Sequence, residues 1–393
     1  MAGVLWLRAV VAGAAVLSLA GCSKADLAVL KAPACPEGSA ARPERQEVRP
    51  SGTVWAWAPP FQAPEGTPGE GPVPGLTDVV SIADSGYTVV AVRADGTVWS
   101  YGTNVDGSLG HGSRERHYLA VPRQVTGIGP AHAVYSSGPT FYVVLRDGTV
   151  MAWGADRFLV RAGKREGYDG VTRPEPVPGV KGVAAMGPGA LNAFALRDDG
   201  RVLGWGVNLT DVLGDRDSTR LTTVDGVRGV VDVASAGGAV VAATADGRVC
   251  AWGGNAHGLL GVEPRGGQSG RPVLVGGLKD VVQVAGGSDV AYALDRDGTV
   301  RAWGRGASGA LGDGDRSDHT SARPVRVDGL PEIRRIAAHG LTGYAIDTSG
   351  GLWAWGSGLM LGDHAPRTAR PVRIPLPGPA LDVSGHHAIV GAE

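Results

Sequence analysis

The segment DGTVMAWG (147–154) decides the fold of this chain, because variants of it recur along the whole sequence. Each variant has a glycine turn, an apolar pair, and then an aromatic pair or Trp-Gly. The other copies are SGTVWAWA (51–58), DGTVWSYG (95–102), DGRVLGWG (199–206), DGRVCAWG (246–253), DGTVRAWG (297–304) and GGLWAWG (350–356). Six copies close at positions 102, 154, 206, 253, 304 and 356, which are 52, 52, 47, 51 and 52 residues apart. This period predicts an array of repeated structural units.

The residues around each copy predict four strands. Asp-Gly between two apolar runs indicates a hairpin, and a type I′ turn there requires positive φ at both central residues. The preceding strand, such as FYVVLR (141–146), is apolar on both faces, as expected when sheets pack against neighbouring sheets. A glycine-rich turn such as SLGHG (108–112) follows, and then a proline-bearing strand such as RPVRV (323–327). Four strands in about 50 residues are typical of one blade of a β-propeller.

The repeat assigns a structural role to its turn glycines and to its aromatic residue, and we expect the tryptophans to pack between blades rather than to bind carbohydrate. The asparagines that follow the aromatic unit, Asn104, Asn208 and Asn255, are expected to cap a turn through side-chain to backbone hydrogen bonds. The structural residues are Trp57, Gly96, Gly102, Gly148, Trp153, Gly154, Gly200, Trp205, Gly206, Gly247, Trp252, Gly253, Gly298, Trp303, Gly304, Trp355 and Gly356.

These blades resemble the regulator-of-chromosome-condensation repeat family, which carries an Asp-Gly turn, a Trp-Gly and a Leu-Gly-x-Gly turn in each blade. The resemblance covers residues 48–393. It implies an all-β fold, a seven-bladed propeller of four-stranded antiparallel blades. The histidine that is frequent in the family's strand before Asp-Gly appears here only around His386 and His387.

The two ends of the repeat array are incomplete in a complementary way. Residues 383–393 supply an inner strand without Asp-Gly or Trp-Gly, and residues 51–57 supply an outer hairpin without an inner strand. Together they predict one composite blade, which would close the ring and remove free sheet edges. The propeller domain is therefore expected to span residues 48–393.

The first residues indicate export. An apolar run of 12 residues, Ala9 to Ala20, is too short to span a bilayer but suits a signal peptide. It ends in Leu-Ala-Gly-Cys (19–22), which resembles the bacterial lipobox. We expect residues 1–21 to be a lipoprotein signal peptide, Cys22 to be acylated, and residues 22–47 to form a flexible tether that holds the protein at the cell membrane, outside the cytoplasm. The alternative is an ordinary secretory signal with an incidental cysteine.

Two further cysteines, Cys35 in the tether and Cys250 in an apolar strand, leave their pairing open. A disulfide suits an oxidising compartment. It would, however, have to join a mobile tether to a buried strand, which argues against it.

Composition and motifs exclude several classes of function. The net charge is −1, with 37 basic and 38 acidic residues, and no basic stripe suggests nucleic-acid binding. GRGASG (304–309) matches a dinucleotide-binding pattern but leads into a repeat turn rather than a helix. DGDRSDHT (313–320) lacks the glycine and distal glutamate of an EF-hand loop. The adjacent His386 and His387 should point to opposite faces of a strand. We therefore predict no metal, no cofactor and no catalytic residue.

Two segments depart from the repeat and are the candidate partner-binding sites. One is the proline-rich insertion 58–75 with an exposed Phe61, and the other is the loop 155–170. Aromatic and arginine side chains on a loop suit a protein contact, although a diverged loop without a partner is the alternative. The candidate residues of the second segment are Arg157, Phe158, Arg161, Arg165 and Tyr168.

The leading hypothesis is a monomeric, non-catalytic scaffold at the cell envelope that binds an unknown protein or cell-wall component. The resemblance adds a second possibility, since secreted propellers of this repeat type include β-lactamase inhibitors. A third is an envelope lyase or hydrolase that uses the central pocket. Nucleotide exchange on a small GTPase, the role of the eukaryotic namesake, is excluded by export. An apolar patch on one face would favour binding, and a deep polar funnel would favour catalysis.

Overall fold

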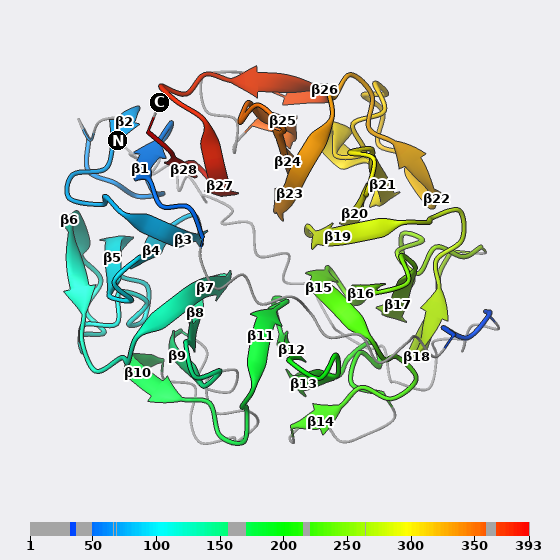
Figure 1. Ribbon diagram of the computed structural model, residues 1–393, viewed down its shortest axis with the longest axis horizontal. Helices are drawn as coiled ribbons and strands as arrows, with labels where there is room; N and C mark the ends of the chain where they lie inside the picture. Colours follow the sequence, from blue (N-terminus) through cyan, green and yellow to red (C-terminus); the bar gives the residue numbers. More distant parts are fainter. Residues whose placement is uncertain are drawn as a thin grey trace, which may run out of the picture.

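A computed structural model describes residues 32–36, 49–155 except 66 and 68, 170–214, 221–358 except 264, and 367–392. Seven four-stranded antiparallel sheets surround a central axis, with the innermost strand of each sheet nearest to it (Figure 1). The expected all-β, seven-bladed propeller is confirmed. Apart from a short 3₁₀ turn, η2 (Ala307–Gly309), the elements given below are strands.

The blades are numbered here in chain order, and each is given from its inner to its outer strand. Blade 1 is β3 (Val79–Asp84), β4 (Thr88–Arg93), β5 (Val98–Thr103) and β6 (Tyr118–Val125). Blade 2 is β7 (Ala131–Ser137), β8 (Thr140–Leu145), β9 (Val150–Gly154) and β10 (Val171–Pro176). Blade 3 is β11 (Val183–Met186), β12 (Asn192–Arg197), β13 (Val202–Gly206) and β14 (Thr222–Thr223).

The remaining blades complete the ring. Blade 4 is β15 (Val230–Ala236), β16 (Ala239–Thr244), β17 (Val249–Gly254) and β18 (Gln268–Leu274). Blade 5 is β19 (Val281–Gly286), β20 (Val290–Asp295), β21 (Val300–Arg305) and β22 (Thr320–Arg326). Blade 6 is β23 (Ile333–His339), β24 (Thr342–Asp347), β25 (Leu352–Ser357) and β26 (Arg367–Ile374). Blade 7 is β27 (Ala380–Ser384), β28 (His387–Val390), β1 (Thr53–Ala56) and β2 (Gly71–Pro72).

Blade 7 is the composite blade that the incomplete ends predict. Its two inner strands come from the C-terminal end of the chain, and β1 joins β28 in an antiparallel register that pairs Val54 with Ile389. Figure 1 shows this junction where the blue and dark red strands lie side by side. The ring is therefore closed by hydrogen bonds between segments from opposite ends of the sequence.

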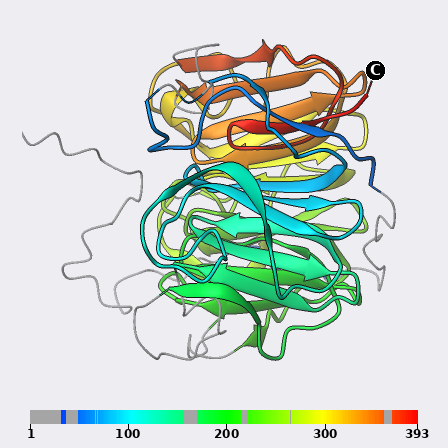
Figure 2. The ribbon, with the colours of Figure 1, turned by 90° about the vertical axis from the view of Figure 1, so that its left-hand side faces the viewer.

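Alternation of strand direction gives the ring two distinct faces, which Figure 2 shows from the side. The turns between first and second strands and the loops between third and fourth strands emerge on one side, called here the long-loop face. The Asp-Gly turns and the connections between blades emerge on the other, the Asp-Gly face. The two faces present different chemistry.

The tryptophans of the repeat lie in the core between blades, as predicted. Trp153, Trp205, Trp252 and Trp303 have no exposed surface, and Trp355 is 1% exposed. Strands such as β16 and β20 are buried at every residue, since both of their faces pack on neighbouring blades.

The Asp-Gly hairpins do not contain the predicted type I′ turn. In the hairpin of blade 2, Gly148 has φ +79° but Asp147 is not in the positive-φ region. The Gly148 N–H donates to Leu145 O at 2.9 Å, and Asp147 Oδ1 accepts from Thr149 N at 2.8 Å. This is a type I turn followed by a left-handed glycine bulge. The aspartate stabilises the turn by bonding to the backbone two residues ahead, which needs no positive φ.

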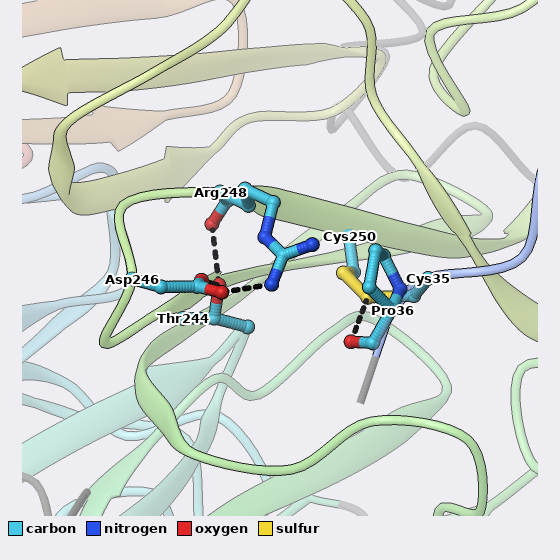
Figure 3. The surroundings of a disulfide bond; sticks show 6 residues. All are labelled: Cys35, Pro36, Thr244, Asp246, Arg248 and Cys250. Atoms are coloured by element: carbon cyan, nitrogen blue, oxygen red, sulfur yellow. Dashed lines mark hydrogen bonds and ion pairs between the residues drawn. A yellow bond between two sulfur atoms is a disulfide. The ribbon is translucent and has the colours of Figure 1, made fainter. Parts of the chain in front are cut away.

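Residues 32–36 lie on the outer edge of blade 4. Ala34 pairs with Val273 of β18, Cys35 N donates to Pro272 O at 3.0 Å, and Leu274 N donates to Pro33 O at 3.0 Å. Cys35 forms a disulfide with Cys250, with 5.8 Å between the two Cα atoms (Figure 3). The argument against this pairing is wrong, because this part of the expected tether is docked on the propeller.

The other predictions for the N-terminal region are not tested. Cys22 lies outside the described residues, as do the signal peptide and most of the proposed tether. Among the residues that the structure describes, no helix is long and apolar enough to cross a membrane.

Candidate functional site

The loops of the long-loop face are fixed by buried asparagines. Asn104, Asn208 and Asn255 each accept a hydrogen bond at Oδ1 from the leucine N–H of the following Leu-Gly turn, at 3.1, 2.9 and 3.0 Å. Their Nδ2 groups donate to loop carbonyls, for example Asn208 to Gly214 O at 2.7 Å. The predicted capping role is confirmed, and these bonds fix the Leu-Gly turn in each of the three loops.

The same loops are bonded to the next blade. The indole Nε1–H of the tryptophan in one blade donates to the carbonyl just before Leu-Gly in the preceding blade. Among the described residues, four such bonds join Trp153 to Ser108, Trp252 to Val212 and Trp303 to Leu259, each at 2.8 Å, and Trp355 to Ala310 at 3.0 Å. A buried indole N–H needs such an acceptor. The loop of one blade thus completes the core of its neighbour.

A hollow of about 590 Å³ opens on this face between blades 4 and 5. Its walls carry mostly ionisable side chains, namely His257, Arg265, Arg305, Asp318, His319 and Thr320. We call this set the charged groove. His257 and Arg265 come from the loop that follows β17, and the others come from the end of β21, the loop that follows it and the start of β22.

Ion pairs order the groove. Arg305 Nη2 lies 3.0 Å from Asp318 Oδ2, and this hydrogen bond holds the pKa of Asp318 below its usual value. Asp289, 4.0 Å from both His257 and Arg305, has a raised pKa because burial outweighs the lowering effect of these two neighbours. Opposite charges therefore alternate around the hollow, a pattern that suits a polar partner surface.

The acidic loop 313–320 does not assemble a calcium site. Asp313 Oδ2 lies 2.9 Å from His319 Nε2, and Asp315 Oδ2 lies 3.7 Å from its Nδ1, while Asp318 pairs with Arg305. Burial lowers the pKa of His319, but its hydrogen bonds to Ser317 and Asp313 raise it overall. Within the described ranges, no group of three or more His, Cys, Asp or Glu could hold a metal ion.

A second hollow, of about 310 Å³, lies at the axis on the Asp-Gly face, where Arg49, Arg334, Arg335 and Asp382 meet apolar residues of the inner strands. Arg335 Nη2 is 2.8 Å from Asp382 Oδ1. Nearby, burial raises the pKa of Asp232 to about 6, against the lowering effect of two backbone hydrogen bonds and of Arg335.

The axial polar groups hold neighbouring blades together. In blades 4 to 6 the pairing register of the inner strand shifts near its start. The residues that follow this shift are Asp232, Gln283 and Arg335. Asp232 Oδ2 accepts from Val284 N of blade 5 at 3.0 Å, and Gln283 Oε1 accepts from Ile336 N of blade 6 at 2.9 Å. Their bonding capacity is used between blades, which is a structural role.

A third cluster is fully buried where blade 7 meets blade 1. His387 Nδ1 donates to Asp84 Oδ2 at 2.9 Å, and its Nε2 lies 2.6 Å from the hydroxyl of Tyr101. Asp84 also accepts from the N–H groups of Gly86 and His386. Burial alone would raise the pKa of Asp84, but the charge and hydrogen bond of His387, with His386 and His339, hold it well below its usual value.

Comparison with known proteins identifies the family. Residues 51–390 match the sequence profile of the RCC1-like domain. The chain belongs to the RCC1-like domain family. The RCC1-like propeller described here is 29% identical to the mouse E3 ubiquitin-protein ligase HERC2 over 71% of this chain and 6% of that protein. It is 26% identical to the regulator of chromosome condensation of Drosophila melanogaster, over 73% of this chain and 56% of that one.

Solved structures share the fold of this RCC1-like propeller. Prp20p of Saccharomyces cerevisiae, whose structure was described with its binding to Gsp1p and histones, gives a TM-score of 0.76 at 20% identity, over 88% of this chain and 93% of that one. Human WBSCR16 gives 0.70 at 23% identity, over 87% and 100%. The chain spans about half or less of the curated relatives described, so their activities do not transfer to it directly.

The partner-binding residues predicted for this RCC1-like propeller are only partly within the described ranges. Phe61 is half-buried rather than exposed, because its ring packs edge-on against Tyr87 and His386, with centroids 5.6 Å apart in both pairs. Its N–H donates to Gly86 O at 2.6 Å. Outside the described residues lie Arg157, Phe158, Arg161, Arg165 and Tyr168.

Sequence reasoning missed two groups. The charged groove joins loops that follow motifs 51 residues apart. The acidic segment 313–320 stands out in the sequence, but no local pattern marks its contact with the loop of the preceding blade. The Asp84 and Tyr101 cluster had one signal, since Tyr101 stands where most blades carry tryptophan. Among the described residues, the exposed large hydrophobic side chains are dispersed over three blades: Val121, Leu191, Leu209 and Val282. These residues therefore form no apolar patch of the kind that would favour binding.

Proposed function

We propose that this RCC1-like propeller is a non-catalytic binding scaffold of the cell envelope, held to the membrane by acyl chains on Cys22, that grips a protein or cell-wall component with its long-loop face. The observation that carries the proposal is the construction of this face. Asparagine caps and carbonyl–indole bonds fix the Leu-Gly turns of this face, and ion-paired side chains line the groove. A preorganised polar surface loses little entropy on binding.

Two features support the export of the chain. The Leu-Ala-Gly-Cys segment resembles a lipobox. The Cys35–Cys250 disulfide is a bond that persists mainly in oxidising compartments. Both favour a location outside the cytoplasm.

The carboxylates near the axis already accept hydrogen bonds within the protein, which supports a non-catalytic role. Near the axis Asp84 and Asp382 are buried and Asp232 is half-buried, and each accepts hydrogen bonds from backbone N–H groups or from a neighbouring side chain. A general base needs a lone pair that is free to reach substrate.

Crosslinking of the membrane-anchored protein to its neighbours tests the binding function. Arg305→Ala should reduce recovery of the crosslinked partner about tenfold, the effect of losing roughly 1.4 kcal/mol at a contact. Arg201→Ala, an exposed arginine on the Asp-Gly face, is the matched control and should leave recovery unchanged. Equal recovery with both variants would reject the groove as the binding site.

The anchor has its own test. Cys22→Ser should move the protein from the membrane fraction to the soluble fraction and abolish incorporation of labelled fatty acid. Retention of the label in the variant would show that Cys22 is not the acylated residue.

A second candidate function rests on one observation. The pKa of Asp232, raised to about 6 beside an axial hollow lined by arginines, is the kind of perturbation found in active sites. An envelope lyase or hydrolase would then lose turnover of a wall polymer in Asp232→Asn. Turnover by the native protein that persists in Asp232→Asn would remove Asp232 as its catalyst.

A further inference from the structure

The outer edge of β18 serves as a docking strand for the chain's own N-terminal segment. Two backbone hydrogen bonds, Cys35 N to Pro272 O and Leu274 N to Pro33 O, attach residues 32–36 to it. This is β-strand addition, in which backbone bonds supply affinity and an anchoring side chain supplies specificity. The anchoring side chain here is Cys35, which is 7% exposed and packs with the apolar residues between blades 3 and 4.

The burial of Cys250 shows how completely this segment covers blade 4. Cys250 occupies the second strand position of the repeat motif, where the other six blades carry Trp55, Trp99, Met151, Leu203, Arg301 and Trp353. Leu203 is 8% exposed and the other five side chains are partly exposed, whereas Cys250 has no exposed surface. Residues 32–36 therefore occupy a surface that stays open to solvent in five of the six other blades.

Both sulfur atoms of the disulfide are shielded from solvent. A reductant must reach a sulfur atom to open a disulfide, and the low exposure of Cys35 and Cys250 prevents this while the segment is docked. Figure 3 shows Pro36 and the Asp246–Arg248 pair close by. The bond thus acts as a permanent clasp rather than as a readily reversible switch. We use the name clasp for residues 32–36 with the Cys35–Cys250 bond.

The clasp changes where the chain leaves the propeller. Without it, the first described residue with a backbone hydrogen bond to the ring would be Gly52 in blade 7, through its N–H to Val79 O. With it, the first described residue bonded in this way is Pro33 in blade 4, whose carbonyl accepts from Leu274 N. The two blades lie on opposite sides of the ring (Figure 1). The clasp therefore moves the point of attachment from one side of the molecule to the other.

We propose that the clasp makes the rim of blade 4 the side of the propeller that faces the lipid bilayer. The inference rests on the proposed acylation of Cys22. From Cys22 to Cys35 the chain can extend at most about 45 Å, whereas from Cys22 to Gly52 it could extend about 100 Å. The short tether keeps blade 4 near the membrane and leaves blade 7 on the far side.

The experiment uses the full-length acylated protein in vesicles that carry an acceptor dye on a lipid headgroup. A donor fluorophore is introduced at Lys279, near the rim of blade 4, or at Thr77, between blades 7 and 1; both positions are exposed. We expect energy transfer at least about twofold higher from position 279 than from position 77, because the reach of the chain differs about twofold and energy transfer falls steeply with distance. Equal transfer from both positions in the native protein would overturn the proposal.

Two variants of Cys35 separate the contributions of the disulfide and of the backbone hydrogen bond to the docking of residues 32–36. Cys35→Ser removes the disulfide but keeps the N–H that bonds to Pro272. Cys35→Pro removes both, since proline has no N–H. Transfer from position 279 should fall by about half in Cys35→Pro, and by less in Cys35→Ser. Unchanged transfer in Cys35→Pro would also overturn the proposal, because the segment is peripheral and its loss leaves the seven blades intact.

A separate measurement distinguishes failure of the lipid anchor from failure of the clasp. Thiol blocking followed by mass mapping should find no free thiol at Cys35 or Cys250 in the native protein, and both after reduction in denaturant, whether or not Cys22 is acylated. Free thiols in the native protein would reject the clasp. A protein with blocked cysteines that does not float with vesicles would reject the anchor, and with it the orientation.

Discussion

The N-terminal part of the chain joins the ring at blades 4 and 7, and the two junctions differ in kind. In blade 7, β1 is a third strand with hydrogen-bonded neighbours on both sides, and the adjoining polar cluster of Asp84, Tyr101 and His387 is fully buried. In blade 4, residues 32–36 add to a complete sheet and are held by two backbone bonds and one covalent bond. The first junction makes the ring, and the second makes an attachment to it.

Removing the C-terminal strands should have the largest effect. A chain without residues 383–393 loses β28 and part of β27, which leaves β1 without its inner partner. We expect unfolding to lose its cooperativity, which corresponds to a loss of at least about 5 kcal/mol in the free energy of unfolding. Calorimetry measures this change. Removal of residues 391–393 alone, which keeps β28, is the control, and an unchanged melt of the longer deletion would disprove the closure.

Breaking the clasp should have the next largest effect. The bond joins residues 215 apart in sequence, and a cross-link of that span destabilises the unfolded chain by about 5 kcal/mol in the chain-entropy description. Cys35→Ser should lower the free energy of unfolding by about that amount while unfolding stays cooperative. Denaturant titration checks both. Loss of cooperativity would mean that the clasp, like blade 7, is part of the ring.

A smaller effect is expected at the polar cluster of blade 7. Asp84→Asn places an amide opposite three donors, the N–H groups of Gly86 and His386 and the ring of His387, and should lower stability by about 3 kcal/mol. The pKa of Asp84 is depressed in the folded state. Its contribution is therefore full above the unfolded value near 4 and is lost as pH falls toward the folded value. The native protein should lose stability below pH 4 more steeply than the variant.

The smallest effect is expected at an acid near the clasp. The hydrogen bond from Arg248 lowers the pKa of Asp246 to about 2, so its contribution also disappears between about pH 4 and pH 2. Its side chain is 30% exposed, and solvent screens the pair. Asp246→Asn should change stability by only about 0.5 kcal/mol in the same titrations. A loss of stability as large as that of Asp84→Asn would show that the Asp246–Arg248 pair is as well shielded from solvent as the polar cluster of blade 7.

Most of the fold could be predicted from the sequence because of the repeat. The period near 50, the aromatic positions, the asparagine caps and the complementary ends predict the blades and their closure because each is set by local pattern. The turn type was missed because Asp-Gly serves both a type I′ turn and a type I turn with a glycine bulge, and the side chain of Asp147 decides between them.

Contacts between distant segments were not predictable in the same way. Cys35 and Cys250 are 215 residues apart, and nothing near Cys35 indicates which of several proline-bearing outer strands it will join. The charged groove likewise depends on Arg305 meeting Asp318 beside a loop from another blade. Such sites follow from tertiary packing, which a repeat pattern leaves undetermined.

The bonds between loop carbonyls and indoles have a consequence for how this protein can diversify. In these four bonds the acceptor is a backbone atom, and the residues that supply it are Ser108, Val212, Leu259 and Ala310, whose side chains differ in size and include one hydroxyl. Substitution at these positions leaves the acceptor in place. The long-loop face can therefore acquire new specificities, by natural variation or in a display library, while the joints between its blades stay the same.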